Sequence, residues 1–133
     1  MKIVIDTCVI LDVFANRESF KNDSFNVLKL CIEGKLSGCV SSNSISDIYY
    51  ILHKYNHNKK KSLEDIKKLL EIIDVIDVTK EDIINATESN INDFEDAILE
   101  ECAKRNHINT IVTRNTTDFQ NSSLNILSPT QVK

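Results

Sequence analysis

Four aspartates stand where their carboxylates could act together: Asp6, Asp47, Asp96 and Asp118. Carboxylates that converge repel one another, so such a cluster destabilises a fold unless a divalent cation lies between them. The chain has no HExxH motif and no CxxC pair, which argues against a zinc site of Cys or His. Oxygen ligands without clustered His or Cys select hard cations. The pattern therefore predicts a site for Mg²⁺ or Mn²⁺.

The elements around these aspartates alternate between strand and helix. Short β-branched runs predict strands at residues 3–5, 37–41, 75–78, 110–113 and 124–127. Apolar residues at helical spacing predict helices at about residues 9–14, 22–33, 44–55, 60–73, 80–89 and 93–105. This alternation favours a parallel sheet that is covered on both faces. We therefore expect a single domain over residues 1–133, a three-layer α/β/α sandwich with a central, mainly parallel sheet of about five short strands.

Asp6 is the aspartate that is hardest to explain as a purely structural residue. It directly follows the buried strand at 3–5, where a carboxylate loses hydration unless a cation or several donors meet it. Asn115 and Asp118 follow the strand at 110–113, although Asp118 taken alone could equally be a turn residue. Ligands of open parallel sheets bind beyond the carboxyl ends of strands, near the point where the strand order reverses. These residues therefore meet at one edge if the two strands are neighbours.

Three further acids lie at predicted helix starts. Asp93 and Asp96 are expected in the first turn of the helix that Asn92 caps. Asp47 is expected in the first turn of the helix that Ser44 caps, with the chemistry of a capping box. Taken alone, Asp47 or Asp93 is more often only a helix cap than a ligand. The convergence of several acids on one edge of the sheet is what favours a functional site.

The composition limits the classes of protein that remain. The 133 residues carry 16 Lys and Arg against 20 Asp and Glu, a net charge of −4, and 41% are hydrophobic. No apolar run approaches the ~20 residues that span a bilayer, and Asp6 interrupts the N-terminal apolar run too early for a signal peptide. The two glycines cannot form a dinucleotide-binding or phosphate-binding motif. We expect a cytoplasmic protein with reduced thiols and no membrane partner.

Several segments together resemble the PIN domain, a family of metal-dependent ribonucleases. The segments are residues 3–7 with Asp12, residues 44–52 with Asp47, residues 93–98, residues 111–115, Asp118 with Phe119, and residues 127–129. The likeness covers nearly the whole chain in order. Within the family, the chain is most similar to the prokaryotic subgroup of toxins from toxin–antitoxin systems. The resemblance implies the PIN-like form of the expected α/β fold.

The resemblance also implies roles for single residues. The catalytic acids would be Asp6, Asp47, Asp96 and Asp118, and the metal ligands would be Asp6, Asp93, Asp96 and Asp118. Asp47 stands where the family usually has Glu, and its shorter side chain reaches less far. Thr7, Thr113 and Asn115 match polar positions that hold the metal ligands in orientation. Asp12 is shared with the subgroup, and a hydrogen-bonding or helix-surface role is at least as good an interpretation of it.

The chemistry of the family implies an endoribonuclease that depends on one or two Mg²⁺ or Mn²⁺ ions. A metal-activated water attacks the RNA phosphodiester in line, and the products carry 5′-phosphate and 3′-hydroxyl ends. The subgroup implies a toxin that a cognate antitoxin protein holds inactive, and its members are often homodimers. A catalytically silent PIN-like module that binds protein or RNA is the alternative, because of Asp47 and the acidic net charge. A phosphatase with an aspartyl nucleophile fits less well, since the sequence after Asp6 lacks the second acid of a DxD motif.

Basic residues that could contact RNA lie in two places. Arg114 is close to the expected metal site, and Lys59, Lys60 and Lys61 belong to a basic turn between two helices. The tyrosines of the preceding helix could stack on bases. The alternative is a solvated turn with its tyrosines in the core or at a dimer interface.

Overall fold

A sheet of five parallel strands forms the centre of the computed structural model, which describes residues 1–133. The strands are β1 (Lys2–Ile5), β2 (Ser37–Ser41), β3 (Asp74–Ile76), β4 (Thr110–Val112) and β5 (Asn125–Leu127). Their order across the sheet is β3-β2-β1-β4-β5, and every neighbouring pair is parallel. The predicted parallel sheet is confirmed, although β3 and β4 end slightly earlier than predicted.

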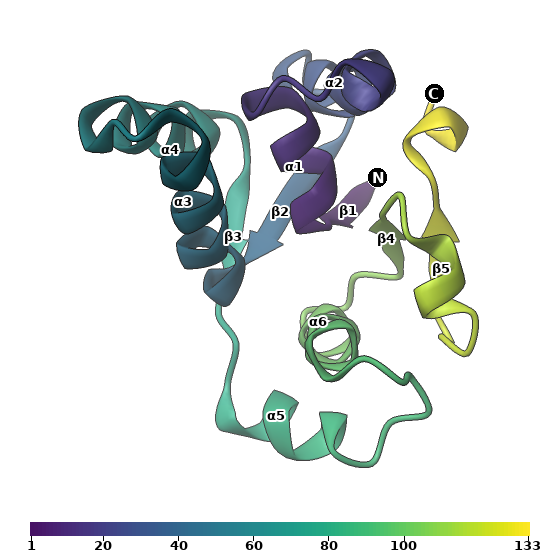
Figure 1. The fold of residues 1–133 in the computed structure, drawn as a ribbon. Helices are drawn as coiled ribbons and strands as arrows, with labels where there is room; N and C mark the ends of the chain where they lie inside the picture. Colours follow the sequence, from purple (N-terminus) through teal and green to yellow (C-terminus); the bar gives the residue numbers. More distant parts are fainter.

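Six α-helices cover the two faces of this sheet (Figure 1). They are α1 (Thr7–Phe14), α2 (Glu18–Ile32), α3 (Ser42–Asn56), α4 (Lys59–Ile72), α5 (Lys80–Ala86) and α6 (Phe94–Arg105). Two short 3-10 helices, η1 (Thr116–Phe119) and η2 (Pro129–Gln131), follow β4 and β5. In Figure 1, α1 to α4 lie on one side of the sheet and α5 and α6 on the other, which confirms the three-layer α/β/α architecture. None of the helices combines the length and the apolar character that a bilayer crossing requires.

The alternation of side chains along β1 divides the core into two clusters. Ile3 and Ile5 pack with residues of α1 to α4, and Val4 packs with residues of α5 and α6. All three side chains are fully buried. Successive residues of a strand point to opposite faces, so a strand with helices on both faces needs an apolar residue at every position. This is why an unbroken β-branched run predicts the centre of the sheet.

The predicted start of α3 is wrong, because β2 leads into this helix without a loop. Ser41, the last residue of β2, has the extended backbone of an N-cap residue (φ −77°, ψ 149°), and α3 begins at Ser42. The predicted cap, Ser44, lies inside the first turn, where its hydroxyl oxygen is 2.7 Å from that of Ser41. Asp47 therefore lies in the second turn of α3 and does not take part in a capping box.

The start of α6 also differs from the prediction. Asp93, and not Asn92, is the N-cap residue, and its Oδ1 accepts a hydrogen bond from the backbone N–H of Asp96 at 3.0 Å. The capping role that was weighed for Asp93 is therefore present. Helix α2 begins at Glu18, earlier than predicted. The prediction missed its first turn because that turn contains mostly polar residues and shows no apolar spacing.

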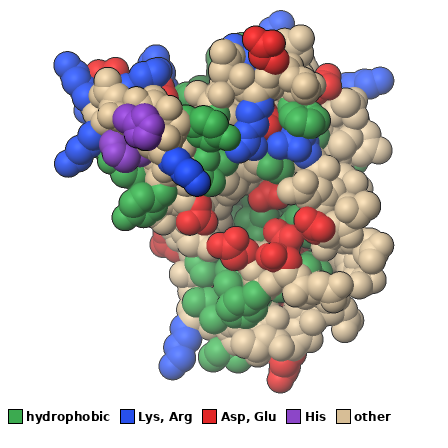
Figure 2. Space-filling model, in the orientation of Figure 1, with side chains coloured by type: hydrophobic (Ala, Val, Ile, Leu, Met, Phe, Trp, Pro, Cys, Tyr) green, Lys and Arg blue, Asp and Glu red, His purple; other side chains and the backbone are tan.

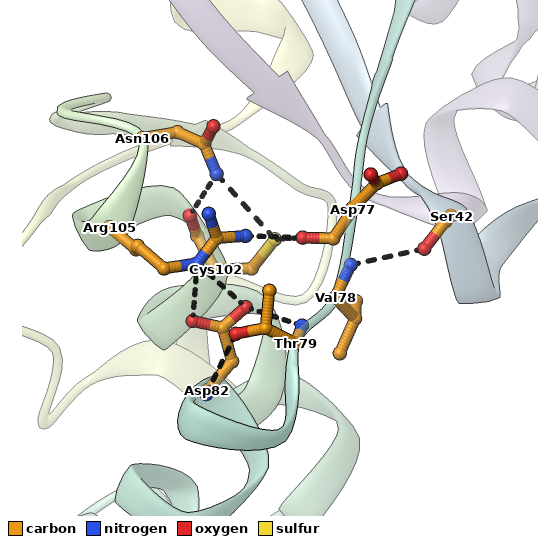
Figure 3. Close-up of polar contacts among 8 residues, drawn as sticks. All are labelled: Ser42, Asp77, Val78, Thr79, Asp82, Cys102, Arg105 and Asn106. Atoms are coloured by element: carbon orange, nitrogen blue, oxygen red, sulfur yellow. Dashed lines mark hydrogen bonds and ion pairs between the residues drawn. The ribbon is translucent and has the colours of Figure 1, made fainter.

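A polar network fastens the connection between β3 and α5 to two other elements (Figure 3). Arg105, at the end of α6, donates hydrogen bonds from Nε to both carboxylate oxygens of Asp82 at 3.0 and 3.2 Å. Its Nη2 donates to the backbone carbonyl of Asp77. The backbone N–H of Val78 donates to the hydroxyl of Ser42 at 3.1 Å. The network therefore ties the start of α3 to the end of α6.

Gly38 allows β2 to pack closely against the core, and we expect Gly38→Ala to destabilise the protein. A Cβ atom at this position would lie 2.7 Å from Sγ of Cys31 and 2.9 Å from Cδ1 of Ile5, which is closer than van der Waals contact. Overpacking of this kind costs about 1–3 kcal/mol. Urea titration measures the loss in free energy of unfolding, and adding Cys31→Ala should recover part of it. Equal stability of Gly38→Ala and the unmodified protein would contradict this packing.

Candidate active site

The carboxyl ends of β1 and β4 form the switch point of the sheet. The chain runs outward from β1 through β2 to β3 on one side, and it then places β4 and β5 on the other. Open parallel sheets bind ligands at such a point. β1 and β4 are direct neighbours, as the convergence of Asp6 and Asp118 requires. The backbone N–H of Asp6 donates to the carbonyl of Val112 at 2.9 Å, so Asp6 continues the ladder at this edge.

Three donors hold the carboxylate of Asp6 in one orientation. The backbone N–H of Thr7 donates to Oδ1 at 2.8 Å, which makes Asp6 the N-cap residue of α1. Oδ2 accepts a hydrogen bond from the hydroxyl of Thr113 at 2.8 Å and a longer one from the thiol of Cys8 at 3.8 Å. Burial raises the pKa of Asp6 above its usual value, and the three hydrogen bonds oppose part of that rise. Asp6 is thus a desolvated carboxylate in a fixed position.

Six carboxylates line one cavity of about 500 Å³ at this edge of the sheet. They are Asp6, Asp47, Asp93, Glu95, Asp96 and Asp118. The loop after β1, α3, the start of α6 and η1 contribute them. Figure 2 shows acidic side chains gathered around the hollow on this face of the molecule. The structure therefore brings together every aspartate that was predicted as a catalytic acid or a metal ligand. Thr7 and Asn115 also line the cavity, and Thr113 lies beneath it as the hydrogen-bond donor to Asp6.

No basic side chain forms an ion pair with any of these six acids. The pKa of Asp96 is raised to about 7, first by burial and then by the charges of neighbouring carboxylates, of which Asp6 contributes most. Burial also raises the pKa of Glu95, and the charge of Asp47 adds to the rise. The carboxylates therefore repel one another where water is partly excluded, and a divalent cation would relieve that repulsion.

The donor set of the cavity fits a hard cation that is bound partly through water. No group of three His, Cys, Asp or Glu side chains is arranged so that it could hold a metal ion directly. Mg²⁺, however, keeps several water ligands and commonly uses only one or two protein carboxylates. The cavity offers carboxylate, hydroxyl and amide oxygens, a single thiol at Cys8 and no histidine. Donors of this type suit Mg²⁺ and Mn²⁺ better than zinc.

The fold and the acids of this cavity match a known family. The PIN domain family matches residues 2–117, a range that contains every acid of the cavity except Asp118. The chain belongs to the PIN domain family. Ribonuclease VapC1 of Aquifex aeolicus (strain VF5) is 29% identical over 132 residues, which cover 96% of this chain and 90% of that protein. The resemblance of the sequence to PIN domains is thereby confirmed.

Two solved structures share the fold of this PIN domain over nearly its whole length. VapBC2 from Rickettsia felis, bound to a DNA fragment from their promoter, has a TM-score of 0.74 at 16% identity, over 96% of this chain and 98% of that chain. A toxin–antitoxin complex from Klebsiella pneumoniae has a TM-score of 0.70 at 17% identity, over 98% of this chain and 99% of that chain.

One predicted RNA contact of this PIN domain, Arg114, is held by a buried carboxylate. Asp12 is fully buried, and Arg114 donates to its two oxygens from Nε and Nη2 at 2.7 and 3.0 Å. The hydroxyl of Ser24 donates to the same carboxylate at 2.7 Å. Asp12 therefore has the hydrogen-bonding role that was one interpretation of it, and not a place on the helix surface. The pair ties the loop between Thr113 and Asn115 to α1 and α2, and an RNA contact by Arg114 stays a prediction.

The basic turn lies apart from the acid cavity. Lys59, Lys60 and Lys61 form the exposed first turn of α4 and do not line the cavity, so a contact with RNA there stays a prediction. Tyr50 and Tyr55 are 70% and 63% exposed, which rules out the interpretation that these two rings fill the core.

Glu95 and Arg17 line the cavity and were not predicted from the sequence, whereas Tyr50, one of the tyrosines expected to stack on bases, lines it as well. The run at 93–96 contains three acids in four positions and could have indicated Glu95. Tyr50 lies three residues after Asp47, so both side chains share one face of α3. Arg17 carries no such local signal, because it lies between two helices and reaches the cavity only through the fold.

Asp96→Asn should stabilise the metal-free protein at alkaline pH. The pKa of Asp96 is about 7 in the fold, against an ordinary value of 3.8. The stability that this raised pKa contributes is fully present below about pH 4 and is lost as the pH rises through about 7. Asparagine carries no charge and removes this loss. Because Asp96 is partly exposed, solvent screening limits the gain to about 1–2 kcal/mol near pH 8.5.

Urea unfolding in EDTA, at about pH 5 and pH 8.5, measures this effect. Glu88→Gln is a matched control, because Glu88 is an exposed acid outside the cavity and should respond at neither pH. A stabilisation by Asp96→Asn that is equal at both pH values would contradict charge repulsion as its cause.

Proposed function

We propose that this PIN domain is an endoribonuclease that requires Mg²⁺ or Mn²⁺ and hydrolyses RNA phosphodiester bonds. The observation that carries the proposal is the set of six carboxylates at the switch point of the sheet, none of which has a basic partner. Such a set weakens the fold, whereas a metal-dependent hydrolase requires it. The Aquifex aeolicus relative is a ribonuclease by name, which supports RNA as the substrate.

Asp6, Asp96 and Asp118 would hold one or two ions, with Asp93 as a further ligand directly or through water. A bound ion supplies a lowered pKa for the attacking water and neutralises charge on the reacting phosphate. Asp47 lies in the same cavity on α3 and would bind the ion through water. Oxygen-only coordination of this kind agrees with the donors that line the cavity.

The residues of the chain orient a water molecule and take its proton. Asp6 or Asp96 accepts that proton at a carboxylate oxygen. A bond forms between the water oxygen and phosphorus, in line with the ribose 3′ oxygen. The bond between phosphorus and the 3′ oxygen breaks, and that oxygen keeps the electron pair and takes up a proton. The products therefore end in a 5′-phosphate and a 3′-hydroxyl.

Asp6→Asn and Asp96→Asn should each lower the rate of RNA cleavage by about 10²-fold or more, because each removes a charge that the ion and the water require. Gel assays of structured RNA in Mg²⁺ or Mn²⁺ measure the rate, and EDTA should abolish cleavage. Glu88→Gln should cleave as the unmodified protein does. Equal cleavage in every lane would indicate a contaminating nuclease and overturn the proposal.

We also propose that the enzyme is the toxin of a toxin–antitoxin pair and that its cognate antitoxin holds it inactive. The toxin–antitoxin complex from Klebsiella pneumoniae, which shares the fold over nearly its whole length, supports this assignment. Expression of the chain alone in a bacterial host should arrest growth, whereas Asp96→Asn at the same protein level should not. Growth arrest by both proteins would contradict RNA cleavage as its cause.

A catalytically silent PIN-like module that binds protein or RNA is the second candidate. One observation favours it: no three side chains are arranged to hold a metal ion directly. Asp47 stands in place of the glutamate that is usual in the family, and this departure also favours the silent module. Calorimetric titration separates the candidates. Mg²⁺ or Mn²⁺ binding at millimolar concentration that Asp118→Asn weakens supports the enzyme, and no binding supports the silent module.

A further inference from the structure

The wall of the acid cavity carries one aromatic ring and one cation beside the six acids. Tyr50 is the only aromatic residue that lines the cavity, and Arg17 is the only basic one. Hydrolysis by a metal-activated water requires neither group. A nucleotide, however, has a partner for each: its base stacks on aromatic rings, and its phosphate pairs with a guanidinium group.

Tyr50 is 70% exposed although it lines the cavity. Its position three residues after Asp47 places the ring and the carboxylate on one face of α3. Tyr49 contacts the Tyr50 ring edge-on, with ring centroids 5.6 Å apart and an interplanar angle of 72°. Tyr49 itself is stacked on His53, with centroids 5.8 Å apart and an angle of 4°. These neighbours restrict the Tyr50 ring and leave most of it uncovered beside the acids.

Arg17 is the looser of two guanidinium groups that share one carboxylate. Arg114 donates to Asp12 at 2.7 and 3.0 Å, whereas Nη1 of Arg17 approaches Asp12 only to 3.7 Å, beyond hydrogen-bond length. Two positive charges against one negative charge leave this cluster with a net charge of +1. The side chain of Arg17 is 31% exposed and lines the cavity. The excess positive charge is therefore available to an anion that enters the cavity.

We propose that Arg17 and Tyr50 form a nucleotide-binding subsite on the wall of the cavity, which holds an unpaired nucleotide beside the scissile phosphate. Arg17 binds a phosphate of the substrate, and Tyr50 stacks on the base of the adjoining nucleotide. A base inside a duplex is already stacked and paired, so a side chain reaches its face only after unpairing. Because every base has a face for stacking, the subsite selects strandedness and not sequence. This inference rests on the proposed ribonuclease function and adds two residues that hold the substrate.

Cleavage of a single-stranded RNA and of a duplex of the same sequence, both in Mg²⁺, tests the role of Tyr50. The unmodified protein should cut the single strand faster. Tyr50→Ala should lower kcat/KM for the single strand about 5- to 100-fold and change the duplex rate little, and Tyr50→Phe should keep the full preference. Tyr55→Ala is the matched control, because Tyr55 is 63% exposed on the same helix but lies outside the cavity.

Fluorescence anisotropy with labelled single-stranded RNA tests the role of Arg17 in binding. The measurement uses the Asp96→Asn background in Mg²⁺, in which cleavage of the RNA should be slower by about 10²-fold or more. Arg17→Gln should weaken binding about 10-fold at low salt, with a shallower salt dependence that corresponds to about one lost phosphate contact. Arg17→Lys should recover part of the affinity. A salt dependence that does not change in Arg17→Gln would overturn the phosphate contact.

The outcomes separate this inference from the proposed function. Metal-dependent cleavage that does not distinguish single strand from duplex, in the unmodified protein and in Tyr50→Ala alike, overturns the subsite and leaves the ribonuclease. Absence of any metal-dependent cleavage overturns the ribonuclease, and the anisotropy measurement then decides the subsite by itself. If Tyr50→Ala changes the oligomeric state in light scattering and leaves RNA binding unchanged, the ring belongs to a protein interface and the subsite is overturned.

Discussion

The carboxylates of one cavity repel one another, and the rest of this PIN domain has to stabilise the fold against that repulsion. The fold holds Asp6, Asp96 and Asp118 around a common space, and no basic side chain pairs with them. The pKa of Asp96 near 7 reflects the unfavourable surroundings of a partly buried charge. The stability that tolerates this arrangement comes from elsewhere, namely from the two apolar clusters on either side of the sheet. The site is therefore prepared for a cation by packing that lies outside it.

Regular elements hold the acids of the cavity, and two of these acids also have a structural task. Asp6 is the N-cap residue of α1, and Asp93 is the N-cap residue of α6. The positive end of a helix favours a carboxylate at its first turn, which offsets part of the repulsion. A capping role and a metal-binding role are thus compatible in one residue. The same helix start that fixes the side chain also brings it to the edge of the sheet.

In a second group of charges, the carboxylate is paired, unlike the carboxylates of the cavity. Asp12 is fully buried, yet Arg114 and Ser24 satisfy its oxygens with short hydrogen bonds. This buried pair fastens the loop after β4, from which Thr113 donates to Asp6. It also leaves the positive charge of Arg17 in excess at the cavity wall. The site therefore depends on two kinds of carboxylate. The buried Asp12 is paired and holds the loop after β4, whereas the acids that line the cavity have no basic partner. The guanidinium group of Arg17 lies beside them on the cavity wall.

The order of strands and helices, and five of the six acids, could be predicted because local patterns record them. The run from Ile3 to Ile5 is apolar at every position since both faces of β1 are covered, and Asp6 stands out because an acid ends that run. Residues that come together only through the tertiary fold show no such local pattern in the sequence. Ser41, Ser42 and Ser44 all offer an N-cap for α3, so only the direct passage from β2 decides that Asp47 lies in the second turn. The place of β1 beside β4, and of Arg17 in the acid cavity, follows from how the chain crosses the sheet. Contacts between distant segments have no period along the chain, and tertiary packing alone settles them.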